Sequence, residues 1–283
     1  MTYKTEHSLE IQEVSINFRV LGIDSGVPLF ILHGGPGFDH TYLLVSSVWE
    51  DLGRNRPVIL YDQRGTGRSS PVGSGNSCTL ADQLSDLEAL RKHLDYNQMD
   101  LLGHSWGGFL GMAYTARYPK QVRRLVLVGS AAPRLQDGIC LFEHIFPETT
   151  ERQKAVAFAQ SLGDKDAIRR FTRDYLSMLF YSPEKRDTFL EKVDPANFRP
   201  HIAEALSRDA GRFDLNPELP KFHQATLVTS GRYDINVAPS VAYHIFRLVP
   251  NAQFEIFEQS GHLPFYEEPV KFANVVERFL IEN

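Results

Sequence analysis

Short, uninterrupted apolar runs recur along the chain and predict buried strands. A run without a polar face fits a strand covered on both sides, as in a parallel sheet. Ahead of the first run, residues 8–22 alternate apolar and polar positions, which predicts two half-exposed antiparallel strands. The predicted buried strands cover residues 28–32, 57–61, 98–102, 124–129, 225–231 and 253–257.

Apolar residues at helical spacing fill the intervals between the first four of these strands. The clearest case is residues 79–94, where leucines recur every three to four positions and Thr79 with Asp82 forms a capping box. Further helices are predicted over residues 41–53 and 109–118. Alternating strands and helices indicate a parallel sheet with helices on both faces.

The pattern changes between residues 133 and 222, where helical periodicity continues without a buried strand. Because the α/β pattern resumes directly afterwards, we interpret this segment as an inserted helical lid rather than an independent domain. The prediction is an α/β core made of residues 1–132 and 223–283, with residues 133–222 as the lid. The remaining predicted helices cover residues 136–146, 151–162, 164–181, 183–192 and 200–208 in the lid, and 238–248 and 267–282 after it.

Charge and cysteine content exclude several classes of function. The net charge of −5 leaves no basic footprint for nucleic acid or an anionic membrane surface. Cys78 and Cys140 are too few and too far apart for a disulfide framework or a metal site, so we expect reduced thiols and no metal or other cofactor. The first residues contain no apolar signal segment, and no apolar run is long enough to cross a membrane. We expect a soluble, cytoplasmic protein without nucleic-acid or membrane partners.

The segment Gly103-His104-Ser105-Trp106-Gly107 carries the strongest chemical signal. It lies between a predicted strand and a predicted helix, which is the context of a nucleophile elbow. The turn is so tight that the positions two before and two after the serine must be nearly free of side chain, and glycine fills both. We therefore predict that Ser105 is a catalytic nucleophile.

A serine hydroxyl needs a base, and the base needs an orienting acid. Around a nucleophile elbow these partners follow in the order serine, acid, histidine, on loops after strands. Asp234 and His262 each follow a predicted strand and fit that order. An acid after the strand at 124–129 is the alternative to Asp234.

A glycine-rich loop, residues 33–37, follows the strand at 28–32 and predicts an oxyanion hole. Backbone N–H groups there stabilise the charge of a tetrahedral intermediate, and we assign the donors to Gly35 and Trp106. Pro36 has no N–H. The loop Gly65-Thr66-Gly67-Arg68 lacks the full phosphate-binding pattern, so nucleotide binding is rejected.

Three motifs together resemble the signatures of the proline iminopeptidase (prolyl aminopeptidase) family of α/β-hydrolases. They are residues 33–37, residues 62–69 (Asp-Gln-Arg-Gly-Thr-Gly-Arg-Ser) and residues 103–108. The chain departs from the family pattern at Thr66, where cysteine is usual, and at His104, where glycine is frequent. The resemblance implies an α/β-hydrolase fold and the same roles for the triad and the oxyanion donors.

The resemblance also implies release of an N-terminal residue, typically proline, from short peptides or amides. Family members hold the substrate's free amine with lid glutamates, so at least one lid carboxylate is expected to face Ser105. The candidate amine-binding residues are Glu143, Glu148, Glu151 and Glu204. Lid aromatics would supply apolar walls, and the candidates are Phe142, Phe146, Tyr175, Phe180 and Tyr181. Residues 133–222 contain no tryptophan, whereas the family often shows a Trp-Glu pair there.

Three alternatives stay open at the level of sequence. A carboxylesterase or lactonase, or a carbon–carbon bond hydrolase, would use the same triad. A catalytically inactive binding protein of this fold would be expected to lose a triad member, and all three candidates are present. Oligomeric state and the exact substrate are not predicted.

Overall fold

The computed structural model describes residues 5–11, 14–72 and 78–281. In this part of the chain, eight strands form one sheet in the order β1-β2-β4-β3-β5-β6-β7-β8. β1 pairs antiparallel with β2, and β2 with β4; all other pairs are parallel. The strands are β1 Thr5–Ile11, β2 Val14–Gly22, β3 Leu29–Leu32, β4 Pro57–Tyr61, β5 Met99–His104, β6 Val122–Val128, β7 Ala225–Gly231 and β8 Ala252–Phe257. The predicted fold class, a mostly parallel sheet in an α/β protein, is confirmed.

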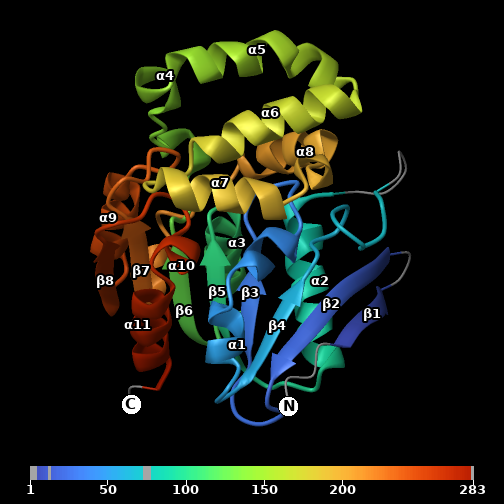
Figure 1. Ribbon diagram of the computed structural model, residues 1–283. Helices are drawn as coiled ribbons and strands as arrows, with labels where there is room; N and C mark the ends of the chain where they lie inside the picture. Colours follow the sequence, from blue (N-terminus) through green and yellow to red (C-terminus); the bar gives the residue numbers. More distant parts are fainter. Residues whose placement is uncertain (1–4, 12–13, 73–77, 282–283) are drawn as a thin grey trace.

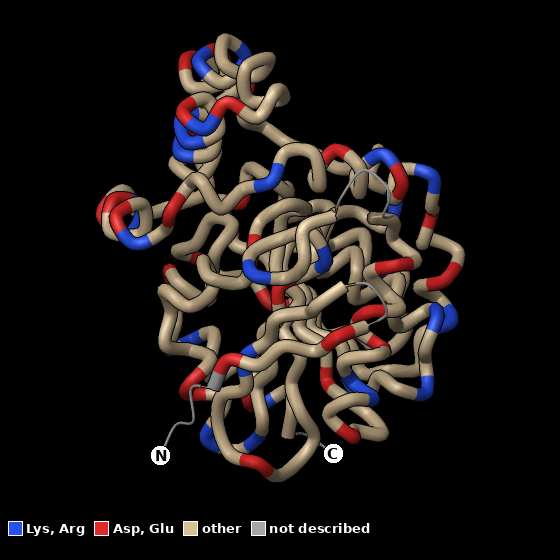
Figure 2. Tube along the Cα trace, turned by 90° about the vertical axis from the view of Figure 1, so that its right-hand side faces the viewer, with Lys and Arg blue, Asp and Glu red and all other residues tan. Residues whose placement is uncertain are grey.

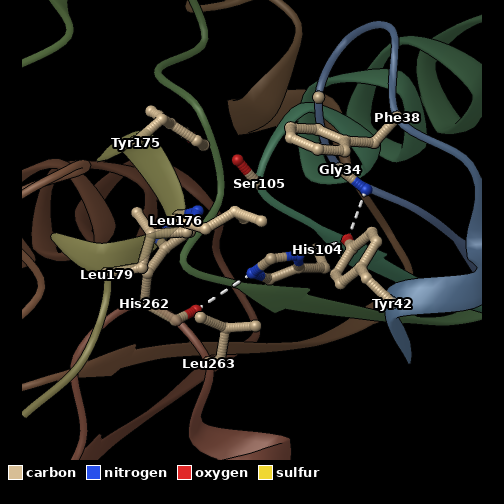
Figure 3. A pocket seen from close by; sticks show the side chains of 11 residues that line it. Gly34, Phe38, Tyr42, His104, Ser105, Tyr175, Leu176, Leu179, His262 and Leu263 are labelled. Atoms are coloured by element: carbon tan, nitrogen blue, oxygen red, sulfur yellow. Dashed lines mark hydrogen bonds between the residues drawn. The ribbon is translucent and has the colours of Figure 1, made fainter. Parts of the chain in front are cut away.

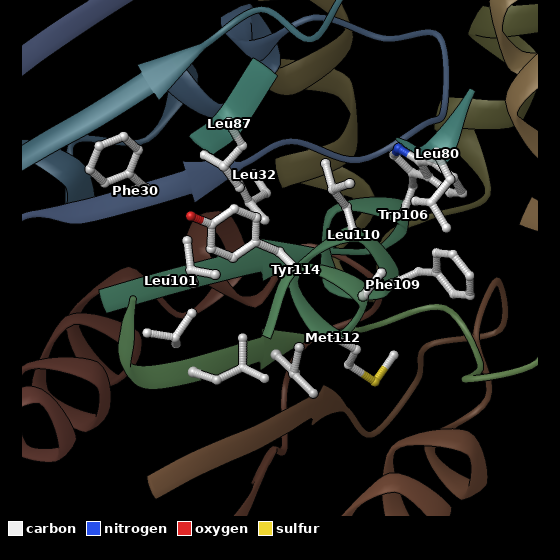
Figure 4. Packing of buried hydrophobic residues seen from close by; sticks show 14 of the residues in the cluster. Phe30, Leu32, Leu80, Leu87, Leu101, Trp106, Phe109, Leu110, Met112 and Tyr114 are labelled. Carbon is white, nitrogen blue, oxygen red and sulfur yellow. The ribbon is translucent and has the colours of Figure 1, made fainter. Parts of the chain in front are cut away.

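Helices cover both faces of the sheet because alternate residues of each central strand point to opposite sides. In β3, Phe30 and Leu32 belong to one apolar cluster and Leu29 and Ile31 to the other. Figure 4 shows the first cluster, in which side chains of α3 pack against the strands. That cluster includes α2 Leu80–His93, α3 Trp106–Arg117 and α9 Pro239–Leu248, whereas α1 Val48–Leu52 and α11 Pro269–Ile281 belong to the second.

Local signals place several helix ends as expected, but two predicted helices are broken. Thr79 and Asp82 form the predicted capping box at the start of α2. The helix expected at 41–53 is instead the 3-10 helix η1 His40–Val45 followed by α1. The break lies at Ser46, whose backbone is extended and whose hydroxyl donates to the carbonyl of Phe265 at 2.6 Å. Residues 136–146 form only η2 Leu135–Asp137 and α4 Phe142–Ile145, with Gly138 extended between them.

The described segment between β6 and β7 consists of helices joined by loops and contains no strand, and Figure 1 shows its helices above the edge toward which the parallel strands point. They are α5 Pro147–Ser161, α6 Lys165–Ser177, α7 Pro183–Lys192 and α8 Pro200–Ala210, with α4, η3 Pro195–Asn197 and η4 Leu219–Lys221. A short helix, α10 Pro264–Glu267, precedes α11. Lysine and arginine are interspersed with acidic residues along the trace, lid helices included (Figure 2). Within the described ranges, no helix has the length and apolarity needed to cross a membrane.

Candidate active site

Ser105 occupies a strained turn between β5 and α3. Its backbone angles are φ 57° and ψ −119°, a conformation that residues with a side chain rarely adopt. The flanking glycines allow it, because a Cβ at Gly103 would overlap the carbonyl of Gly107 and one at Gly107 would overlap that of Leu32. This is the geometry of the predicted nucleophile elbow, and it lifts the Ser105 hydroxyl above the strand end.

Asp234 and His262 come together as the sequence predicts. The carboxylate Oδ2 of Asp234 accepts a hydrogen bond from Nδ1 of His262 at 2.7 Å, and both residues are buried. The other oxygen of Asp234 accepts from the backbone N–H groups of Asn236 (3.1 Å) and Val237 (2.9 Å), which fixes the orientation of the carboxylate. Since Nδ1 carries the proton, Nε2 of His262 holds the free lone pair that a general base requires.

Asn236 is a neighbour of the candidate base that sequence reasoning missed. Its side-chain amide lies 3.1 Å from Nε2 of His262 and donates to that lone pair. Among the hydrogen bonds of the described residues, none joins Nε2 to Ser105, and the amide of Asn236 is the partner that Nε2 has.

A buried chain of hydrogen bonds links three loops of the site. Nε2 of His104 bonds to the backbone carbonyl of His262 at 2.9 Å, and because a carbonyl only accepts, Nε2 must carry the proton. Nδ1 of His104 then accepts from the hydroxyl of Tyr42 at 2.6 Å. That hydroxyl in turn accepts from the N–H of Gly34 at 2.7 Å. Burial lowers the pKa of His104 well below its usual value, so the ring is neutral, as this directed chain requires.

The chain of bonds also bears on the oxyanion hole. Because the N–H of Gly34 donates to Tyr42, it is not free to bind an oxyanion. Within the described part of the molecule, the N–H of Gly35 and that of Trp106 donate to no protein acceptor. Trp106 begins α3, where an N–H lacks an intrahelical partner, and its indole N–H is fixed by Gln63 at 3.0 Å. Gly35 and Trp106 are thus placed as predicted, and their role as donors remains a proposal.

The loop that carries His262 is joined to the lid segment after α6. The backbone N–H of His262 donates to the carbonyl of Leu179 at 2.7 Å. The buried carboxylate of Glu267 accepts from the N–H groups of Tyr181 (3.0 Å), Ser182 (2.9 Å) and Gly261 (2.6 Å). Burial raises the pKa of Glu267, and these three donors oppose that shift. Sequence reasoning assigned no role to Glu267.

A narrow cleft with a volume of about 20 Å³ lies over Ser105. Apart from Ser105 and two histidines, its walls consist of glycine, leucine and aromatic side chains, and no carboxylate is among the described residues that line it. Figure 3 shows Phe38 and Tyr175 above Ser105, with Leu176 and Leu179 beside them. The lining residues are Gly34, Gly35, Phe38, Tyr42, His104, Ser105, Tyr175, Leu176, Leu179, His262 and Leu263.

Comparison with known proteins places this site in a family. The family described as alpha/beta hydrolase fold matches residues 27–269. A proline iminopeptidase from Saccharolobus solfataricus is 31% identical, over 93% of this chain and 87% of its own length. The chain belongs to the proline iminopeptidase family of α/β-hydrolases. A proline iminopeptidase from Clostridium botulinum is 29% identical over 99% of both chains.

Solved structures show the same fold at lower identity. The esterase RhEst1 from Rhodococcus sp. ECU1013 superposes with a TM-score of 0.79 at 23% identity and covers 98% of both chains. The meta-cleavage product hydrolase CumD gives a TM-score of 0.73 at 21% identity, again over 98% of both chains. These structures show the fold, while the matching family model and the proline iminopeptidase relatives confirm the family resemblance and make the chain a serine hydrolase.

The lid residues suggested by this family do not lie at the cleft. Glu143 is exposed and pairs with Lys154 at 3.0 Å, and Glu151 pairs with the same lysine at 3.0 Å. Glu148, Glu204 and Phe146 are also exposed, and none of the five lines the cleft at Ser105. Their predicted role in substrate binding has no support from these positions. The helical period predicted a lid here, but it did not indicate which face of each helix turns toward the serine. Of the lid aromatics predicted as walls, Tyr175 lines the cleft.

No metal centre emerges from the same region. In the described ranges, no group of three or more histidine, cysteine, aspartate or glutamate side chains is arranged to hold a metal ion.

The motif at residues 62–69 forms hydrogen bonds with the glycine-rich loop and with η1. Gln63 donates its side-chain amide to the carbonyl of His33 at 2.9 Å, while Asp62 accepts from Nδ1 of His40 at 2.6 Å.

Proposed function

We propose that this member of the proline iminopeptidase family hydrolyses small, uncharged carboxylic esters through an acyl-enzyme on Ser105. The observation that carries the proposal is the apolar lining of the cleft, which contains no carboxylate among the described residues. An ammonium or carboxylate group of a substrate would lose its hydration there without gaining a charged partner, at a cost of several kcal/mol. An uncharged substrate avoids that cost.

The first half of the reaction forms the acyl-enzyme. The Ser105 oxygen attacks the ester carbonyl carbon while Nε2 of His262 accepts the hydroxyl proton, and Asp234 stabilises the imidazolium that forms. The negative charge on the carbonyl oxygen is stabilised by the N–H groups of Gly35 and Trp106. Collapse of the intermediate breaks the ester C–O bond, and His262 gives its proton to the departing alcohol oxygen.

The second half repeats the chemistry with water. His262 accepts a proton from the water that attacks the acyl carbon, and the tetrahedral intermediate again places its charge toward Gly35 and Trp106. When the bond to the Ser105 oxygen breaks, His262 returns a proton to that oxygen. The carboxylic acid leaves and the resting enzyme is restored.

Aminopeptidase activity is the second candidate, and the relatives favour it. Several proline iminopeptidases are 27–31% identical over most of both chains. An aminopeptidase needs a group that recognises the free amine, and in this chain that group would have to come from outside the cleft lining. No feature of the described site specifically favours a carbon–carbon bond hydrolase.

Paired substrates distinguish the two candidates. We expect 4-nitrophenyl butyrate to be cleaved with a much higher kcat/KM than proline 4-nitroanilide, and N-acetylproline 4-nitroanilide to be no worse than the free amine. Ser105→Ala serves as the control for non-enzymatic hydrolysis. Preferred cleavage of the free-amine anilide, lost on acetylation, would replace the ester proposal with the aminopeptidase.

A further inference from the structure

A second apolar chamber adjoins the cleft at Ser105. It has a volume of about 280 Å³, close to the lower limit of the range of about 300–1,000 Å³ that is typical of small-molecule sites. Gly35, Phe38 and Tyr175 line both the cleft and this chamber, so the two spaces share a wall. The chamber residues are Gly35, Pro36, Phe38, Phe171, Thr172, Tyr175, Phe198, Ala203 and Ser207.

Aromatic rings from three parts of the chain form the chamber walls. Phe38 of the glycine-rich loop lies 5.0 Å from Phe198, ring centre to ring centre, and 6.2 Å from Tyr175, nearly parallel to it. Phe171 contributes a further ring from α6. Rings bind well in such surroundings, because offset-stacked and edge-to-face contacts add to the burial of apolar area.

The chamber offers nothing that would hold a charged group. Its described lining contains no lysine, arginine, histidine, aspartate or glutamate. The hydroxyl of Tyr175 is also kept neutral, since burial raises its pKa. A ligand arm that enters from Ser105 must therefore be apolar.

We propose that this chamber binds an aromatic or alicyclic ring carried by one arm of the ester whose carbonyl lies at Ser105. The inference rests on the proposed ester hydrolysis and names its substrate class as ring-bearing, uncharged esters. Because Gly35 lines both spaces, the chamber adjoins the proposed oxyanion site. The chamber acts in substrate selection and takes no part in proton transfer.

Ser207 and Arg208 provide a matched pair of variants. They are adjacent exposed residues of α8, but Ser207 lines the chamber and Arg208 does not. Ser207→Phe places a bulky ring in the chamber, whereas Arg208→Phe places the same ring outside it. Phe171→Ala tests the opposite change by removing part of a wall.

Hydrolysis is followed by pH-stat titration of ethyl acetate, 2-phenylethyl acetate and ethyl 3-phenylpropanoate, which carry no ring, a ring on the alcohol and a ring on the acid. Wild type should prefer at least one ring-bearing ester to ethyl acetate by about 10- to 100-fold in kcat/KM, the factor expected from burying a ring. Ser207→Phe should abolish that preference and leave ethyl acetate unchanged, while Arg208→Phe retains it. Phe171→Ala should weaken it. The chamber proposal would be refuted if Ser207→Phe kept the wild-type preference for a ring-bearing ester, or if it lowered kcat/KM equally for all three esters.

A binding measurement separates failure of the chamber from failure of the proposed function. Boronic acids add to an active-site serine without any need for ester turnover, so calorimetry with 2-phenylethylboronic acid and methylboronic acid reports on the chamber alone. We expect the phenylethyl compound to bind at least 10-fold more tightly to wild type and Arg208→Phe, but not to Ser207→Phe. If no ester is cleaved while this difference persists, the ester proposal fails and the chamber stands. If ethyl acetate is cleaved and the difference is absent, the chamber fails alone.

Discussion

Tyr42→Phe tests whether the buried hydrogen-bond chain positions the site. The substitution removes one oxygen and keeps the ring, which packs beside Phe38, His104 and Phe265. It leaves the N–H of Gly34 and Nδ1 of His104 without the partners they have at 2.7 Å and 2.6 Å. A buried polar group that loses its partner costs about 1–3 kcal/mol, so the free energy of unfolding should fall by about 2–4 kcal/mol.

Urea denaturation measures this loss directly. With a slope of about 3 kcal/mol per M, the midpoint should fall by about 1 M. In the ester assay kcat should fall by about 10-fold, since Gly34 adjoins the proposed donor Gly35 and loss of a whole oxyanion donor costs about 10²–10³. KM should change little, because the apolar walls of the cleft are intact.

Tyr61→Phe is the matched control. The hydroxyl of Tyr61 is buried and has no hydrogen-bond partner among the described residues. Its removal should leave both stability and kcat unchanged, or raise stability slightly. If the two tyrosine variants behave alike, the hydroxyl of Tyr42 does not position the site and the reasoning is refuted.

Four further predictions concern the proposed triad, the lid contact and pH. Ser105→Ala should keep the fold and lower kcat by about 10⁴- to 10⁶-fold, and a fluorophosphonate probe should label only the wild type at Ser105. Asp234→Asn should lower kcat by about 10⁴-fold at unchanged circular dichroism, because the amide favours the wrong tautomer of His262; wild-type rates would place the acid elsewhere. Glu267→Gln should lower the free energy of unfolding by about 2–4 kcal/mol in urea, since its amide cannot accept from all three N–H groups; an unchanged midpoint would contradict this. Burial lowers the pKa of His104 and His33, so below about pH 6.5 the unfolded chain binds protons that the native protein does not. The free energy of unfolding should therefore decrease as the pH is lowered, by about 1.4 kcal/mol per pH unit for each ring. His104→Gln should reduce that slope between pH 5 and 6.5 by about one proton, and an unchanged slope would show that His104 is charged in the folded protein.

The sequence predicts the fold, the strained turn at Ser105 and the contact between Asp234 and His262, because all three follow from local rules. Buried strands must be continuously apolar, the elbow needs glycines around Ser105, and a triad follows the strand ends. The chain Tyr42–His104–His262 could not be predicted, since it joins residues up to 158 positions apart and each has an ordinary structural role when considered alone. His104 was visible as a departure from the family pattern, but its partner Tyr42 carries no sequence signal.

The contacts of His262 indicate which parts of the lid belong to the catalytic centre. Its backbone is held on one side by the carbonyl of Leu179 and on the other by His104. Glu267 adds three hydrogen bonds between the two loops, and Lys185 donates to the carbonyl of Glu267. Movement of the segment that follows α6, which includes Leu179, would break hydrogen bonds that position His262. This segment therefore supports the proposed triad and does not act as a mobile lid. The proposed chamber instead assigns substrate selection to Tyr175 and Phe38, which line both the cleft and the chamber.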